Sequence, residues 1–296
     1  MSAVEETTQT VASARHTDPP KPRTLSTRLL RSEMRLVTGR RRNQMGMLVL
    51  AALPVVLAIA VKVTSPRGRG NNDAGDFLSQ ATANGLFVPL AALTLEMGLF
   101  LPMAIAMLSG DSIAGEANLG TLRYLLTVPV NRTRLLAVKY ASLVIGAFIG
   151  VTIVTVVGAV VGIALFGTGP MLTLSGVQIG FGTAVGRLAL AALYCTAGIA
   201  ALGAVGLFVS TLTEQPIAAT VTVMIVTIVS WIILGVDQLA FLHPWLIVDQ
   251  WMSFSDLFRE PPLWSNLLKG LGQDLAYAAV FWLAAWARFT SKDITS

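Results

Sequence analysis

Residues 115–140 read GEANLGTLRYLLTVPVNRTRLLAVKY, a charged stretch between two long apolar runs. The stretch contains Glu116, Arg123, Arg132, Arg134 and Lys139, whereas the runs on either side carry almost no charge. An apolar run of about 20 residues is long enough to cross the hydrocarbon of a bilayer as a helix. The pattern therefore predicts two membrane spans joined by a charged, helix-prone segment.

The composition of the whole chain agrees with a membrane location. Of its 296 residues 54% are hydrophobic and 12% are charged, whereas a globular domain is roughly a quarter charged. Most basic residues lie in the N-terminal tail and in the quoted stretch, so the net charge of +5 indicates membrane orientation and not nucleic-acid binding. Cys195 is the single cysteine, which excludes a disulfide or a thiolate metal cluster within one chain.

We predict an all-α polytopic membrane protein with six transmembrane helices. The polar quartet 213–216, which ends in a proline, separates the fourth helix from the fifth. The predicted spans are Gln44–Val63, Leu86–Leu108, Ala137–Phe166, Phe181–Leu212, Ile217–Val236 and Leu271–Phe289.

The distribution of basic residues predicts the orientation of these spans. Arginine and lysine are concentrated before the first span, between spans two and three, and after the last span. An even number of spans places these three segments on one side, and the positive-inside rule makes that side cytoplasmic. Both termini are therefore predicted to be cytoplasmic.

The N-terminal region divides into two parts. Residues 1–21 have the composition of a disordered tail, and residues 22–43 form a predicted amphipathic connecting helix. Arg28, Arg31 and Arg35 make one stripe of this helix, while Glu33 falls within its apolar arc. The helix is either a plain interfacial anchor or a contact for a protein partner. Residues 44–289 are the transmembrane domain, and residues 290–296 are a cytoplasmic tail.

The segment between spans two and three, residues 111–131, has the features of a short rigid elbow. We expect Asp111 and Ser112 to cap a helix that contains Glu116. Asn118 and Gly120 weaken that helix, residues 121–126 resume it, and Pro129 starts a turn. We call residues 111–131 the elbow segment.

Two further features concern packing and the outer loop. Gly146 with Gly150, and Gly158 with Gly162, form GxxxG pairs that allow helices to approach closely. Residues 237–269 contain three prolines and three tryptophans, and we read them as one or two outer re-entrant helices before the last span.

Glu96 is an acid inside the second predicted span, about 15 Å from its start. A carboxyl group at this depth is costly, so it faces either a translocation path or a hydrogen-bonded neighbour helix. Pro89 and Pro102 flank it and are expected to bend the helix. His243 lies near two aspartates, a weak metal signal, and we assign no metal site.

The elbow segment resembles a known family. The ordered pattern of Gly115-Glu116, then 120–123 (Gly-Thr-Leu-Arg), then Pro129-Val130, Arg132 and Lys139 is similar to the ABC-2 type permease subunits of ATP-binding-cassette transporters. In that family a serine often follows the proline-valine pair, where this chain has Asn131.

The resemblance implies a set of roles. The elbow would be a cytoplasmic coupling helix that docks on a separate ATPase, and the connecting helix with Arg28, Arg31, Glu33 and Arg35 would brace the same subunit. Two ATP-binding subunits and a second permease chain, identical or paralogous, would complete an exporter in a bacterial plasma membrane. The expected cargo is a small amphiphilic or hydrophobic molecule. The implied coupling residues are Asp111, Glu116, Gly120, Thr121, Arg123, Pro129 and Arg132.

Two observations bear on how such a transporter would be powered. The sequence contains no GxxxxGK[ST] phosphate loop, so ATP and Mg²⁺ are expected on the partner subunit, with no cofactor and no catalytic site on this chain. The alternative is a stand-alone proton-coupled secondary transporter that uses Glu96 as its titrating group.

Overall fold

The computed structural model describes residues 27–64, 84–118 and 132–291. The predicted N-terminal tail (residues 1–21), residues 119–131 of the elbow segment and residues 292–296 of the predicted C-terminal tail lie outside these ranges. In chain order the longer helices are α1 (Thr27–Gly39), α2 (Arg41–Thr64), α4 (Phe87–Gly98), α5 (Phe100–Ser112), α8 (Arg132–Phe166), α9 (Phe181–Leu212), α10 (Pro216–Leu234) and α11 (Trp264–Ser291). A five-residue helix, α6 (Ala114–Asn118), follows α5.

The predicted spans all fall on helices, and four of these helices are long and apolar enough to cross a membrane by themselves. These four are α2, α8, α9 and α10, and the pair α4–α5 adds a fifth if it is counted as one span. The sixth predicted span falls on α11, which does not reach the same apolarity within the described residues because Asn266, Lys269 and Asp274 occupy its first half.

The second predicted span is broken, with α4 and α5 bent by 51°. Pro102 has no N–H to donate to the carbonyl of Gly98, and its ring crowds that carbonyl. The backbone accordingly leaves the helical region at Leu99, whose N–H donates instead to the carbonyl of Glu96 at 3.3 Å. The bend that the flanking prolines predict is confirmed.

α9 is the central helix of the bundle, whereas α2 and α10 lie at its periphery. Within an 18-residue apolar stretch of each helix, 67% of the residues are buried in α9, against 17% in α2 and 22% in α10. The peripheral helices expose large apolar side chains such as Leu48, Val56, Ile225 and Ile232. Surfaces of this kind are stable only against lipid or another apolar surface, which agrees with a membrane-embedded chain.

Glycines allow the closest helix contacts, as the GxxxG pairs predict. A Cβ at Gly158 would lie 2.8 Å from the Cα of Pro89, and one at Gly162 would lie 2.0 Å from the carbonyl oxygen of Gly85. Both contacts bring the start of α4 against α8. A Cβ at Gly206 of α9 would lie 2.0 Å from the Oγ of Ser109 in α5.

The segment between α8 and α9 contains a small hairpin, and the segment between α10 and α11 contains two 3-10 helices. Strands β1 (Met171–Leu172) and β2 (Gln178–Ile179) pair antiparallel, which adds a short sheet to the predicted all-α fold. Helices η1 (Asp237–Trp245) and η2 (Trp251–Phe258) occupy the predicted re-entrant loop. The indole of Trp251 is buried inside the bundle and not at an interface, whereas Trp245 is 77% exposed.

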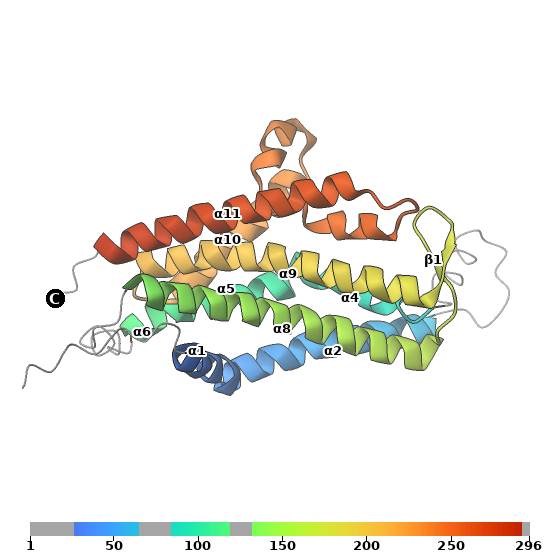
Figure 1. The fold of residues 1–296 in the computed structure, drawn as a ribbon, viewed down its shortest axis with the longest axis horizontal. Helices are drawn as coiled ribbons and strands as arrows, with labels where there is room; N and C mark the ends of the chain where they lie inside the picture. Colours follow the sequence, from blue (N-terminus) through green and yellow to red (C-terminus); the bar gives the residue numbers. More distant parts are fainter. Residues whose placement is uncertain (1–26, 65–83, 119–131, 292–296) are drawn as a thin grey trace, which may run out of the picture.

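The two ends of the bundle differ (Figure 1). Helix α1, helix α6, the start of α8 and the last turns of α11 share one end, and the β1–β2 hairpin lies at the other. The described parts of the connecting helix and of the elbow segment thus lie at the same end of the bundle as the last turns of α11.

We expect Gly162→Ala to destabilise the bundle by roughly 1–3 kcal/mol, because the added methyl overlaps the Gly85 carbonyl and overpacked sites cost that much. The measurement is the free energy of unfolding in mixed detergent micelles. Gly186→Ala in α9 is the control, since a Cβ there meets nothing within 4 Å. Equal stability of the two variants would contradict the α4–α8 contact.

Candidate functional site

The described part of the elbow segment is a helix break between α5 and α6. Ile113 separates the two helices. The hydroxyl oxygen of Ser210, on α9, accepts hydrogen bonds from the N–H groups of Ile113 (3.2 Å) and Ala114 (2.9 Å), and it donates to the carbonyl of Gly110 (3.1 Å). One buried serine therefore satisfies the backbone groups that the break exposes.

The predicted capping role of Asp111 and Ser112 is wrong. Both residues belong to the last turn of α5, and α6 begins only at Ala114. The Ser112 hydroxyl donates to the carbonyl of Ser109 at 2.8 Å. The Asp111 carboxylate instead pairs with the guanidinium groups of Arg40, at 2.9 Å, and Arg42, which ties the start of α2 to the end of α5.

Lys139 forms the centre of a buried ion-pair cluster. Its ammonium lies 2.5 Å from the Glu116 carboxylate of α6 and 3.5 Å from the Glu33 carboxylate of α1, and its side chain is only 2% exposed. Burial raises the pKa of Glu116, and the Lys139 ammonium opposes that shift. The cluster joins the connecting helix, the elbow segment and α8 through a single cation.

Arg132 begins α8 and contacts the other end of the chain. Its guanidinium donates to the carbonyls of Phe289 (3.4 Å) and Thr290 (3.1 Å) in the last turns of α11. The indole N–H of Trp286 donates to the Thr133 hydroxyl at 2.9 Å. A basic side chain at a helix C-terminus satisfies carbonyls that have no partner within the helix.

The structure brings together only some of the predicted site residues. Glu33 and Glu116 meet at Lys139, and Asp111 lies beside them in one small cavity that Glu33, Arg40, Asp111, Glu116 and Lys139 line. Arg31 and Arg35 are exposed on α1. Gly120, Thr121, Arg123 and Pro129, together with the side chain of Arg28, lie outside the described residues.

Glu96 lies far from this cluster, three residues before the break at Leu99. Its side chain is fully buried, and neither carboxylate oxygen has a hydrogen-bond partner within residues 27–64, 84–118 and 132–291. Whether it serves a translocation path stays a prediction.

Sequence reasoning missed two residues, Ser210 and Asp274. Ser210 carries no sequence signal, because serine is common in apolar helices and its partners are about a hundred residues away. Asp274 of α11 is a second buried acid, and it lies beside Gly198 and the Trp251 indole. Its position inside an apolar helix could have been noticed, as it was for Glu96.

The described residues contain no group of three histidine, cysteine, aspartate or glutamate side chains that could hold a metal ion. The His243 ring instead lies 3.1 Å from the carbonyl of Ile233. The contacts that the structure shows at this end of the bundle are ion pairs and hydrogen bonds between helices.

A bundle of long apolar helices with paired charges at one end defines a multi-pass helical membrane protein. Residues 38–230 match the family described as ABC-2 family transporter protein. The match covers more than half of the chain, so the chain belongs to this family and is the membrane component of an ABC-2 type transporter. No curated protein matches the chain.

We expect Lys139→Met to destabilise the protein by roughly 3–5 kcal/mol, because it leaves two carboxylates in a buried site without their cation. Unfolding in mixed micelles measures the loss. Arg134→Met is the matched control on the same helix, since Arg134 is exposed. Adding Glu116→Gln to Lys139→Met should recover part of the stability, and no recovery would contradict the pairing.

Proposed function

We propose that this chain is the permease subunit of an ABC-2 type exporter, and that a separate ATP-binding subunit drives it. The observation that carries the proposal is the elbow segment: a helix break at the end of a bent span, held by Ser210 and by the Lys139 cluster. The family match supports the transporter class.

The contacts of the elbow segment support a role in passing force. At the elbow end, Gly110 of α5 contacts Thr220 of α10, and Ser109 contacts Gly206 of α9. Lys139 joins α6 to α1. A force on α6 would therefore act on α1, α5 and their neighbours together. The 51° bend between α4 and α5 gives α5 a point about which to turn.

The proposed assembly contains two ATP-binding subunits and a second permease chain, identical or paralogous, in a bacterial plasma membrane. ATP and Mg²⁺ bind to the partner subunits. In this arrangement α11 is the sixth span, both termini are cytoplasmic, and η1 and η2 lie at the outer face. The ATPase contacts the end of the molecule formed by α1 and the elbow segment, where Gly120, Thr121, Arg123, Pro129 and Arg132 complete the interface.

The outer half of the molecule favours a small hydrophobic or amphiphilic cargo. An open pocket of about 440 Å³ lies between α4, β1 and η2, and Phe87, Phe254 and Phe258 line it. Small-molecule pockets have volumes of roughly 300–1,000 Å³. None of the described residues that line this pocket is charged, which suits an uncharged group and disfavours a strongly ionic cargo.

Affinity purification of the chain from its native membrane tests the proposal. We expect a soluble protein with a phosphate loop to co-purify in stoichiometric amount, identified by mass spectrometry. Its absence from an intact, folded preparation would overturn the proposed ATPase partner.

The same assay tests whether Glu116 contacts the ATPase directly. Glu116→Lys alone disrupts both the internal pair with Lys139 and any external contact, so it cannot separate the two roles. Glu116→Lys combined with Lys139→Glu restores the internal pair and reverses the charge that Glu116 offers to a partner. We expect the double variant to fold but to recover little ATPase, and full recovery would limit Glu116 to a structural role.

The alternative function, a proton-coupled transporter that works alone, is favoured by one observation, the buried and unpartnered carboxyl of Glu96 within the described residues. We expect proteoliposomes that contain only this chain to take up no protons down an imposed pH gradient, with a pH-sensitive dye as the reporter. The Glu96→Gln variant should behave identically. A proton flux that Glu96→Gln abolishes would favour the alternative.

A further inference from the structure

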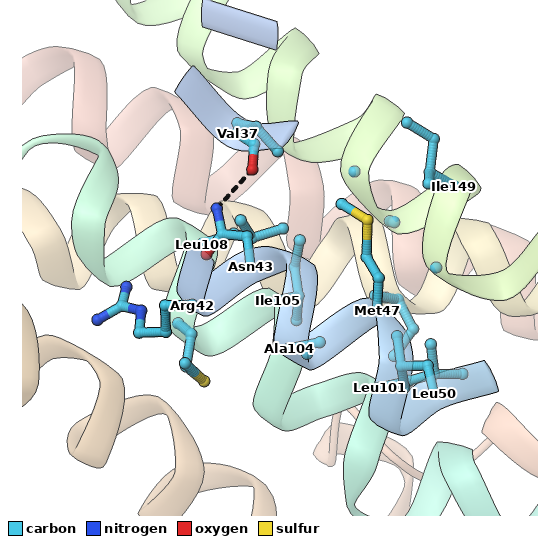
Figure 2. Close-up of a pocket in the computed structure, with 16 residues that line it drawn as sticks. Val37, Arg42, Asn43, Met47, Leu50, Leu101, Ala104, Ile105, Leu108 and Ile149 are labelled. Atoms are coloured by element: carbon cyan, nitrogen blue, oxygen red, sulfur yellow. Dashed lines mark hydrogen bonds between the residues drawn. The ribbon is translucent and has the colours of Figure 1, made fainter. Parts of the chain in front are cut away.

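A narrow crevice runs between α2, α5 and α8, with the end of α1 beside its mouth (Figure 2). Its volume is about 50 Å³. Its α2 wall extends from Arg42 to Leu50, about 12 Å along the helix axis. The crevice is thus a long, shallow groove, and a molecule bound along it would remain partly exposed.

Glycines keep the α8 wall of the crevice low. A Cβ at Gly146 would lie 3.0 Å from the Cδ1 of Leu108, and one at Gly150 would lie 3.5 Å from side-chain carbons of both Leu101 and Leu50. At both positions the glycine lets leucine side chains of α2 and α5 approach the α8 backbone, and a large residue there would displace them and block the crevice.

The chemistry of the lining changes from one end to the other. Figure 2 places the Arg42 guanidinium at one end and Leu50 and Leu101 at the other. Asn43 is the other polar residue of the lining, and its amide already donates to the carbonyl of Val37 at 2.7 Å. The remaining side chains are apolar, so the body of the crevice suits an alkyl chain and offers it no hydrogen bonds.

The mouth of the crevice lies in a surplus of positive charge. It shares Val37, Asn43 and Leu108 with the small cavity of the Lys139 cluster. Among the described side chains of α1, the start of α2 and this cluster, six cations face three carboxylates. The cations are Arg31, Arg35, Arg40, Arg41, Arg42 and Lys139, and the carboxylates are Glu33, Asp111 and Glu116.

The carboxylates engage the inner cations and leave the outer ones exposed. Asp111 pairs with Arg40 and Arg42, and the other two carboxylates pair with Lys139. Arg31, Arg35 and Arg41 are exposed. Exposed arginines beside a membrane-crossing helix attract anionic lipid headgroups.

We propose that the crevice binds an anionic phospholipid, with one acyl chain along α2, α5 and α8 and its phosphate held by Arg41 and Arg42. The apolar slot with a cationic mouth matches the two parts of such a lipid. α2, which forms one wall, is mostly exposed along its apolar length. The phosphate would share Arg42 with Asp111 of α5, so lipid binding would act on the tie between α2 and the elbow segment. The site does not depend on an ATPase partner.

Native mass spectrometry of the purified full chain tests the proposal, with phosphatidylglycerol and phosphatidylcholine of identical acyl chains as the probes. We expect phosphatidylglycerol to be retained in preference. Arg41→Gln should weaken that retention roughly fivefold, the effect of one basic residue near an anionic surface. It leaves the Asp111 pairs intact. Arg134→Gln, which removes an exposed arginine at the start of α8, is the matched control and should have a smaller effect.

A second variant tests the chain-binding slot. Gly150→Leu should fill it and remove lipid retention, whereas Gly186→Leu, at a position with open space, should not. If Gly150→Leu fails to fold, Gly150→Ala is the milder variant, since its methyl makes ordinary contacts. Equal retention of the two lipids, equal effects of Arg41→Gln and Arg134→Gln, or unchanged binding in both Gly150 variants would each overturn the proposal.

Discussion

The buried ammonium of Lys139 is the constraint on which the elbow end of the molecule depends. A cation that is 2% exposed is stable only if carboxylates surround it, and here they come from α1 and α6. Three segments that are separated along the chain must therefore meet at one point of α8. If either carboxylate moved away, the cation would be left underpaired in an apolar setting, so the pairing resists separation of the three segments.

The rest of the bundle extends this constraint through contacts that leave no room for adjustment. Gly206 admits Ser109, Gly110 admits Thr220, and Ser210 holds the backbone at the α5–α6 break. Close packing of this kind replaces the hydrophobic drive that helices lose in lipid. The span formed by α4 and α5 is not straight, because the two helices are bent by 51° at Leu99. A tightly packed α5 that is joined to α4 through a bend is suited to converting a force at the elbow end into a change in the tilt of α4.

Much of the architecture could be predicted from the chain itself. The predicted fourth span, Phe181–Leu212, coincides with α9, and the turn before Pro216 separates α9 from α10 as expected. Glu33 falls in the apolar arc of the connecting helix, and the structure pairs it with Lys139 of the same chain. Asp111 was different. Its position before a helix is typical of a capping residue, whose carboxylate accepts a hydrogen bond from a backbone N–H. Two arginines about 70 residues away bind the carboxylate instead. Pairing with a cation is stronger than a local hydrogen bond to a neutral N–H.

The sequence by itself determined the class of protein, because apolar runs of about 20 residues have few stable places except a membrane, and because prolines and glycines act through local backbone geometry. It also identified the elbow segment by an ordered pattern of residues. Only the tertiary structure decided which charges pair, that Ser210 supports the helix break, and that Trp251 lies inside the bundle and not at its surface. Those outcomes depend on contacts between segments that are distant in the sequence. The energies of these contacts depend on burial and on interatomic distances, which a local sequence pattern does not determine.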